Sequence, residues 1–140
     1  MKKITKILIG ISILVLLTGT VSAADLNEIF TAPSGLHPMG TTTFVDEQGH
    51  NIVICEYNDE NRQTWFENDT DPEYLVEKYN DTCYLGVDDE NDCYLLEVVE
   101  KDGQQYIVSS WTPKGAGETS VILANLLEFN KLNKVTPLEV

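Results

Sequence analysis

An Asp-Gly dipeptide at positions 102–103 separates two runs in which apolar side chains tend to recur at every second residue. A period of two is typical of a β-strand with one buried face, and Asp-Gly is a preferred two-residue loop of a β-hairpin. We therefore expect antiparallel strands over 92–100 and 104–111. If the dipeptide forms the whole loop, Val98 lies opposite Ile107.

A third strand is expected over 82–87, joined to the hairpin by a four-residue turn. That turn length places Cys83 opposite Leu96. It also makes one face of the three strands nearly all apolar, which supports the register because a slip of one residue would reverse the faces of a strand. This predicted apolar face contains Cys83, Leu85, Val87, Tyr94, Leu96, Val98, Ile107 and Trp111. The opposite face is mixed, and we expect another element to cover part of it; its members are Tyr84, Cys93, Leu95, Glu97, Val99, Tyr106, Val108 and Ser110.

An earlier hairpin is indicated by strand-like runs at 42–45 and 51–57, on either side of a polar turn. Gly49 lies in this turn, where a residue without a Cβ takes positive φ at little cost. The polar residues 58–62 that follow are expected to form a loop.

Two helices are predicted. The Asp-Pro-Glu sequence at 71–73 favours a helix start, because Asp caps free amides and Pro and Glu suit the first turn, and this short helix should end near Asn80. A longer helix should begin at Thr119 or Ser120 and run to about Asn133. Its central apolar stripe is expected to contain Ile122, Leu126 and Phe129.

The predicted elements follow one another in the order β-β-α-β-β-β-α. Runs of antiparallel strands with helices between them are typical of the α+β class. We therefore expect an antiparallel sheet with helices packed on it.

The segment Phe30-x-x-Pro33-x-Gly35, followed by the Gly49 hairpin and Asn51-Ile52-Val53-Ile54, resembles the start of PsbP/Mog1-like domains. The resemblance covers about residues 26–135. It implies an antiparallel sheet with helices on both sides and a non-catalytic accessory or binding role. No functional residue of that family can be matched to a position of this chain.

The first 24 residues have the features of a secretory signal peptide. Lys2, Lys3 and Lys6 precede an apolar run of about 15 residues, which is shorter than the ~20 that a transmembrane helix requires. Small residues then permit cleavage after Ala23 or Ala24. We predict that residues 1–24 are removed and that 25–140 form a single secreted acidic domain. The alternative is an uncleaved membrane anchor.

The charge of the chain is strongly negative, with 23 acidic and nine basic residues. Three of the basic residues lie in the predicted signal, so the mature chain would keep six against 23 acidic ones, a net charge of −17. Such a chain should repel nucleic acid and anionic lipid. The expected partners are a cell-envelope protein or a cationic ligand.

The chain contains three cysteines, an odd number for an exported protein. The predicted register places Cys83 and Cys93 three positions apart along the ladder, about 10 Å, and on opposite faces, so we expect that they are not joined to each other. Any intramolecular disulfide should include Cys55.

The sequence contains no G-x-S-x-G elbow, no P-loop and no H-E-x-x-H motif. His37 and His50 have no metal-ligand spacing, and both are expected to be solvated. The acidic run at 88–92 departs from the EF-hand pattern and is expected to be a solvated turn, without strong calcium binding. Asn68 and Asn80 each begin an N-glycosylation triplet, and whether either is modified stays open.

We therefore assign no catalytic, cofactor-binding or metal-binding residue and expect no cofactor. The predicted function is that of a secreted or cell-surface, non-catalytic binding or accessory protein. The alternative is an exported hydrolase that acts through carboxylates. A cleft with two carboxylates, one of them buried, would favour the hydrolase, whereas a closed core with only surface acids would favour the binding protein.

Overall fold

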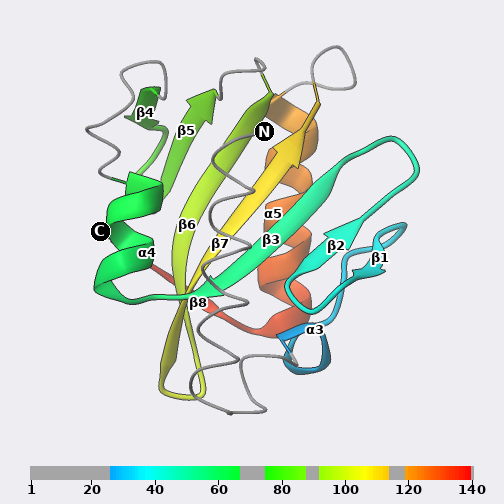
Figure 1. Cartoon of the computed structure of the whole chain (residues 1–140), viewed down its shortest axis with the longest axis horizontal. Helices are drawn as coiled ribbons and strands as arrows, with labels where there is room; N and C mark the ends of the chain where they lie inside the picture. Colours follow the sequence, from blue (N-terminus) through cyan, green and yellow to red (C-terminus); the bar gives the residue numbers. More distant parts are fainter. Residues whose placement is uncertain (1–25, 67–74, 88–91, 114–118, 140) are drawn as a thin grey trace.

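The computed structural model of this chain describes residues 26–66, 75–87, 92–113 and 119–139, and every structural statement below concerns these residues (Figure 1). The helices are α3 (Leu26–Ile29), α4 (Asp59–Phe66) and α5 (Thr119–Asn133). The strands are β1 (His37–Met39), β2 (Thr43–Val45), β3 (Asn51–Glu56), β4 (Leu75–Lys78), β5 (Cys83–Val87), β6 (Cys93–Lys101), β7 (Gln104–Thr112) and β8 (Thr136–Leu138).

All the strands belong to one antiparallel sheet. Its order is β1-β2-β3-β7-β6-β5-β4, which runs from right to left in Figure 1. β7 pairs with β6 along its whole length, so β5 and β8 share the other edge of β6, β5 along its first half and β8 at 98–100. The expected α+β class with an antiparallel sheet is confirmed.

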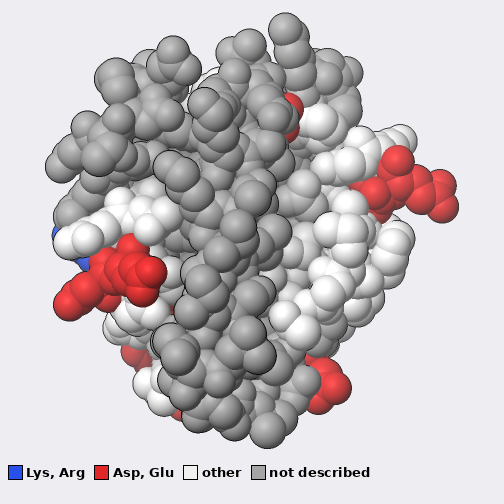
Figure 2. All heavy atoms as spheres, in the orientation of Figure 1, with Lys and Arg blue, Asp and Glu red and all other residues white. Residues whose placement is uncertain are grey.

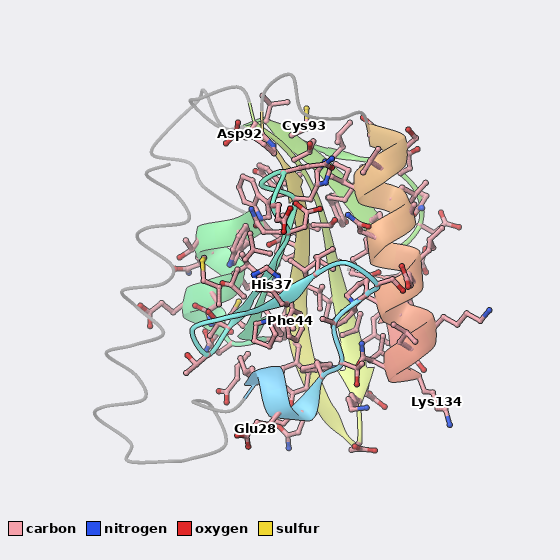
Figure 3. All side chains as sticks on the ribbon, turned by 90° about the vertical axis from the view of Figure 1, so that its right-hand side faces the viewer. Glu28, His37, Phe44, Asp92, Cys93 and Lys134 are labelled. Atoms are coloured by element: carbon pink, nitrogen blue, oxygen red, sulfur yellow. The ribbon has the colours of Figure 1, made fainter. Side chains whose placement is uncertain are left out.

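Helices cover both faces of this sheet, α4 on one side and α5 on the other (Figure 3). The predicted stripe of α5 is fully buried against the face of the sheet that this helix covers; it contains Ile122, Leu126 and Phe129. On the opposite face, which α4 covers, Trp65 of α4 packs together with Trp111 of β7. The predicted final helix, its stripe and the burial of Trp111 are confirmed. None of the helices in the described part of the chain is long and apolar enough to cross a membrane.

The Asp-Gly turn has the predicted geometry. Asp102 and Gly103 both have positive φ, 53° and 80°, as a two-residue hairpin loop of type I′ requires. Val98 pairs with Ile107, which confirms the register of β6 with β7. The earlier hairpin is confirmed as well, with Gly49 at a φ of 88° between β2 and β3.

The predicted register of β5 is wrong by one residue. Cys83 pairs with Glu97 instead of Leu96, and Gly86 instead of Leu85 lies opposite Tyr94. The physical reason is the Tyr94 ring, which lies over Gly86 so closely that a Cβ at position 86 would overlap it. The slip moves Cys83, Leu85 and Val87 from the Trp111 face to the α5 face, where Cys83 and Leu85 join the core.

The position predicted for the first helix is also wrong. Residues 75–78 form strand β4, and the helix α4 lies instead at 59–66, where a loop was expected. Asn58 starts α4 because its side-chain oxygen accepts from the Asn61 amide at 2.8 Å. Trp65 then anchors the helix in the core with 0% exposure. The predicted start at 71–73 lies outside the described residues.

Candidate functional site

A shallow pocket with a volume of about 220 Å³ opens beside the turn between β2 and β3. Two histidines, the only ones in the chain, lie near this turn: His37 on edge strand β1 and His50 at the end of the turn. His37 is exposed, as predicted. The pocket is lined by Gly35, His37, Asp46, Glu47 and Gln48.

Asp46 organises the turn through its carboxylate. Its Oδ1 accepts from the backbone amides of Gln48 and His50, each at 2.9 Å, and its Oδ2 lies 2.9 Å from Nδ1 of His50. Burial acts to raise the pKa of Asp46, but the hydrogen bonds outweigh it and the pKa lies below its usual value. The expectation of a solvated His50 is wrong, because the residue is only 6% exposed and its ring is oriented by Asp46.

Both oxygens of Asp46 are therefore occupied within the turn. In contrast to Asp46, the pocket residues His37 and Glu47 have exposed side chains. This arrangement can offer a carboxylate and an imidazole to a cationic or hydrogen-bonding ligand. Among the described residues, no three His, Cys, Asp or Glu side chains are placed to hold a metal ion.

A second unusual group is Glu97, in the middle of β6 and 1% exposed. Its Oε1 accepts a hydrogen bond of 3.0 Å from Nδ2 of Asn130 on α5. Burial raises the pKa of Glu97 to about 8, and the hydrogen bond only partly counters this. The sequence interpretation placed Glu97 on the mixed face without assigning it a role, although a lone carboxylate within the apolar run 94–99 was a signal of an unusual environment.

The three cysteines are free thiols in the structure. Burial raises the pKa of Cys55 to about 12. Burial and the charge of Glu97 raise the pKa of Cys83 to about 11. Both thiols are therefore protonated at neutral pH and are poor nucleophiles.

Cys83 and Cys93 are not joined, as expected from their separation along the ladder, but their predicted placement on opposite faces is wrong. Both side chains lie on the α5 face of the sheet, because the register of β5 is shifted. They are kept apart by distance along the ladder, since Cys83 pairs with Glu97 while Cys93 pairs with Val87. Four residues of β-strand separate the two pairs, about 13 Å at the usual rise.

Of the two N-glycosylation triplets and the acidic run at 88–92, only the triplet at Asn80 lies wholly within the residues that the structure describes. Asn68 and the acidic residues 88–91 lie outside the described residues, so the structure does not bear on the expected absence of strong calcium binding. Asn80 is exposed, and its side-chain oxygen accepts from the backbone amides of Thr82 and Cys83 at 2.9 and 2.8 Å. The Asn80 side chain therefore shapes the turn that leads into β5.

Acidic side chains appear at several separate places on the face shown in Figure 2, and basic side chains occupy much less of it. The structure thus brings His37 and Glu47 to one surface pocket and encloses Glu97 between β6 and α5. No protein-family model matches the chain, and no curated protein or solved structure matches it either.

Proposed function

We propose that this protein is a non-catalytic binding or accessory domain that is exported and acts outside the cytoplasm. The single observation that carries the proposal is the placement of the reactive side chains. Cys55 and Cys83 are buried and protonated, Glu97 is enclosed in the core, and Asp46 is engaged in its turn. What is offered to a partner is the acidic outer surface.

The proposed partner is a cationic ligand or a basic part of a cell-envelope protein. A net charge of −14 for the whole chain favours such partners, and the pocket beside β2 and β3 offers a concave place for a basic group. Glu47 supplies the exposed carboxylate there. The partner would be recognised by charge and would dissociate as salt is added.

The test is capture of cell-envelope components by the immobilised secreted protein at low and high salt. Glu47→Lys should weaken capture at low salt because it reverses the charge at the pocket. Glu28→Lys is the matched control, since Glu28 is also an exposed acid and lies on α3, outside the lining of the pocket. Capture that is insensitive to both salt and Glu47→Lys would contradict the proposed mode of binding.

The proposed export is tested by determining where the mature protein begins. The positive and apolar leader at residues 1–24 supports cleavage after Ala23 or Ala24. N-terminal sequencing of material recovered from the medium should therefore begin at Ala24 or Asp25. A product that begins at Met1 would contradict cleavage and favour an anchored protein.

The second candidate is an exported hydrolase, and the raised pKa of Glu97 is the observation in its favour, because a protonated carboxyl can act as a general acid. Against it, Glu97 faces the amide of Asn130 and is only 1% exposed. Hydrolysis of envelope polymers by the wild-type protein that disappears in Glu97→Gln would favour the hydrolase over the binding domain.

A further inference from the structure

The contact between Glu97 and Asn130 contains one hydrogen bond and two unsatisfied oxygens. Nδ2 of Asn130 donates to Oε1 of Glu97 at 3.0 Å. Oε2 of Glu97 and Oδ1 of Asn130 are both buried and have no hydrogen-bond partner within the described part of the chain. An unpaired polar atom in a protein interior is costly, so two in one contact require an explanation.

An ionised Glu97 cannot satisfy these atoms. A carboxylate has only acceptors, and the Asn130 oxygen is also an acceptor, so no hydrogen bond can form between them. A single proton on Oε2 converts that atom into a donor for Oδ1. A second, reciprocal hydrogen bond from the protonated Oε2 to Oδ1 of Asn130 would satisfy both orphan oxygens.

The surroundings of Glu97 also favour the neutral form. The elements that pack around it are β5, β7 and α5, and Cys83 of β5 is its direct cross-strand partner. Lys101, on the same strand, donates to the carbonyl of Asn133 at 2.9 Å, and Lys131 of α5 is exposed. Besides Glu97, the titratable side chains on these elements and on β6 itself are Cys83 and Tyr84 on β5, Cys93, Tyr94, Glu100 and Lys101 on β6, Tyr106 on β7, and Glu128 and Lys131 on α5.

We propose that Glu97 is protonated in the folded protein and that its acid–amide pair with Asn130 is a pH-sensitive fastening of helix α5 to the sheet. The fastening is complete in acid and at neutral pH. Loss of the proton at alkaline pH removes one hydrogen bond and leaves a buried anion between β6 and α5. At this point helix α5 is then held by its apolar stripe and by the one hydrogen bond that remains, from Nδ2 of Asn130 to Oε1 of Glu97.

The raised pKa, about 8 against a usual 4.5, agrees with this geometry and sets the pH window. Below pH 4.5 the carboxyl is neutral in both folded and unfolded chains, and the full contribution to stability is present. Between 4.5 and about 8 only the folded chain keeps the proton, so stability falls as the pH rises. Above this window the contribution has been lost.

The experiment compares urea unfolding of the wild-type protein, Glu97→Gln and Glu100→Gln from pH 4.5 to 9. Glutamine supplies the acceptor and the donor of the protonated acid at every pH, so it retains both hydrogen bonds. Glu100 is an exposed acid on the same strand and is the matched control. Effects of the overall negative charge are common to the variants and cancel in the ratio of unfolding constants.

The unfolding constant of the wild type relative to Glu97→Gln should rise about tenfold per pH unit across the window and stay constant above it. The unfolding constant of the wild type relative to Glu100→Gln should not change across the window, because Glu100 is exposed. Parallel pH profiles for the wild type and Glu97→Gln would overturn the proposal.

A second measurement does not depend on the folding of a variant. Carbon-13 NMR of the side-chain carboxyl groups in the wild-type protein should show one glutamate that titrates near 8. Titration of every glutamate in the ordinary range would equally overturn the proposal. Neither result bears on whether the protein binds a cationic partner, so this inference and the proposed function can fail separately.

Discussion

Replacing Gly86 by alanine tests the packing that sets the register of β5. Gly86 is buried and pairs with Tyr94, whose ring covers the place where a side chain would begin. A Cβ built at position 86 lies 2.6 Å from Cε2 of Tyr94 and still closer to the end of the ring. Either the ring or the strand must therefore move.

The ring has little room to move. Tyr94 is 0% exposed, stacks on Trp111 with ring centroids 4.2 Å apart, and meets the edge of Trp65 at 6.2 Å. Overpacking of a close-packed core costs about 1–3 kcal/mol. Alanine restricts the unfolded chain more than glycine does and returns about 0.4–1 kcal/mol of this. We expect Gly86→Ala to lower the free energy of unfolding by about 1–2 kcal/mol.

A double-mutant cycle separates the clash from other effects of the methyl group. In a Tyr94→Leu background the ring is absent, so Gly86→Ala should be neutral or stabilise by about 0.5 kcal/mol. The coupling between the two positions should then be about 1–2.5 kcal/mol, a size typical of side chains in direct contact. Far-UV circular dichroism in urea is the suitable assay, because Tyr94→Leu would also alter tryptophan fluorescence.

Two results would refute the reasoning. A cost of Gly86→Ala below about 0.3 kcal/mol would mean that the ring does not cover this position. A cost that is the same in both backgrounds would mean that it arises from the strand backbone and not from Tyr94. Either would reopen the register in which Cys83 faces Leu96.

Three further outcomes follow from the same structure. Trp111→Ala should lower the free energy of unfolding by about 3–5 kcal/mol, the range for a fully buried large aromatic, and a loss under ~1 kcal/mol in a urea melt would contradict its place in the core. Asp46→Ala should destabilise the protein at pH 7 by about 1–3 kcal/mol, because the hydrogen bonds of Asp46 in the turn are lost. The pKa of Asp46 is lowered, so thermal melts should show a smaller difference between variant and wild type as the pH falls below the usual carboxyl range. A difference that does not change with pH would contradict this role. Native alkylation followed by peptide mapping should label the half-buried Cys93 before the buried Cys55 and should show no peptide that links Cys83 to Cys93.

Local sequence signals were sufficient for the parts of the fold in which neighbours along the chain carry the information. Asp102-Gly103 determines its own turn because both residues accept positive φ, and the alternation on either side then sets the register of β6 with β7. The stripe of α5 likewise follows from helical spacing. The acidic balance of the chain needs no structure at all, because it is a property of composition.

Contacts between distant residues decided the rest. Nothing near Gly86 in the sequence indicates that an aromatic ring eight residues away lies over it, so the apolar pattern favoured a register shifted by one residue. Residues 59–66 are mostly polar, and their helix depends on burial of Trp65 against Tyr94 and Trp111. Glu97 becomes a buried acid only because α5, more than twenty residues later, brings Asn130 to it. These features arise from packing across the sheet, which local propensity and periodicity do not encode.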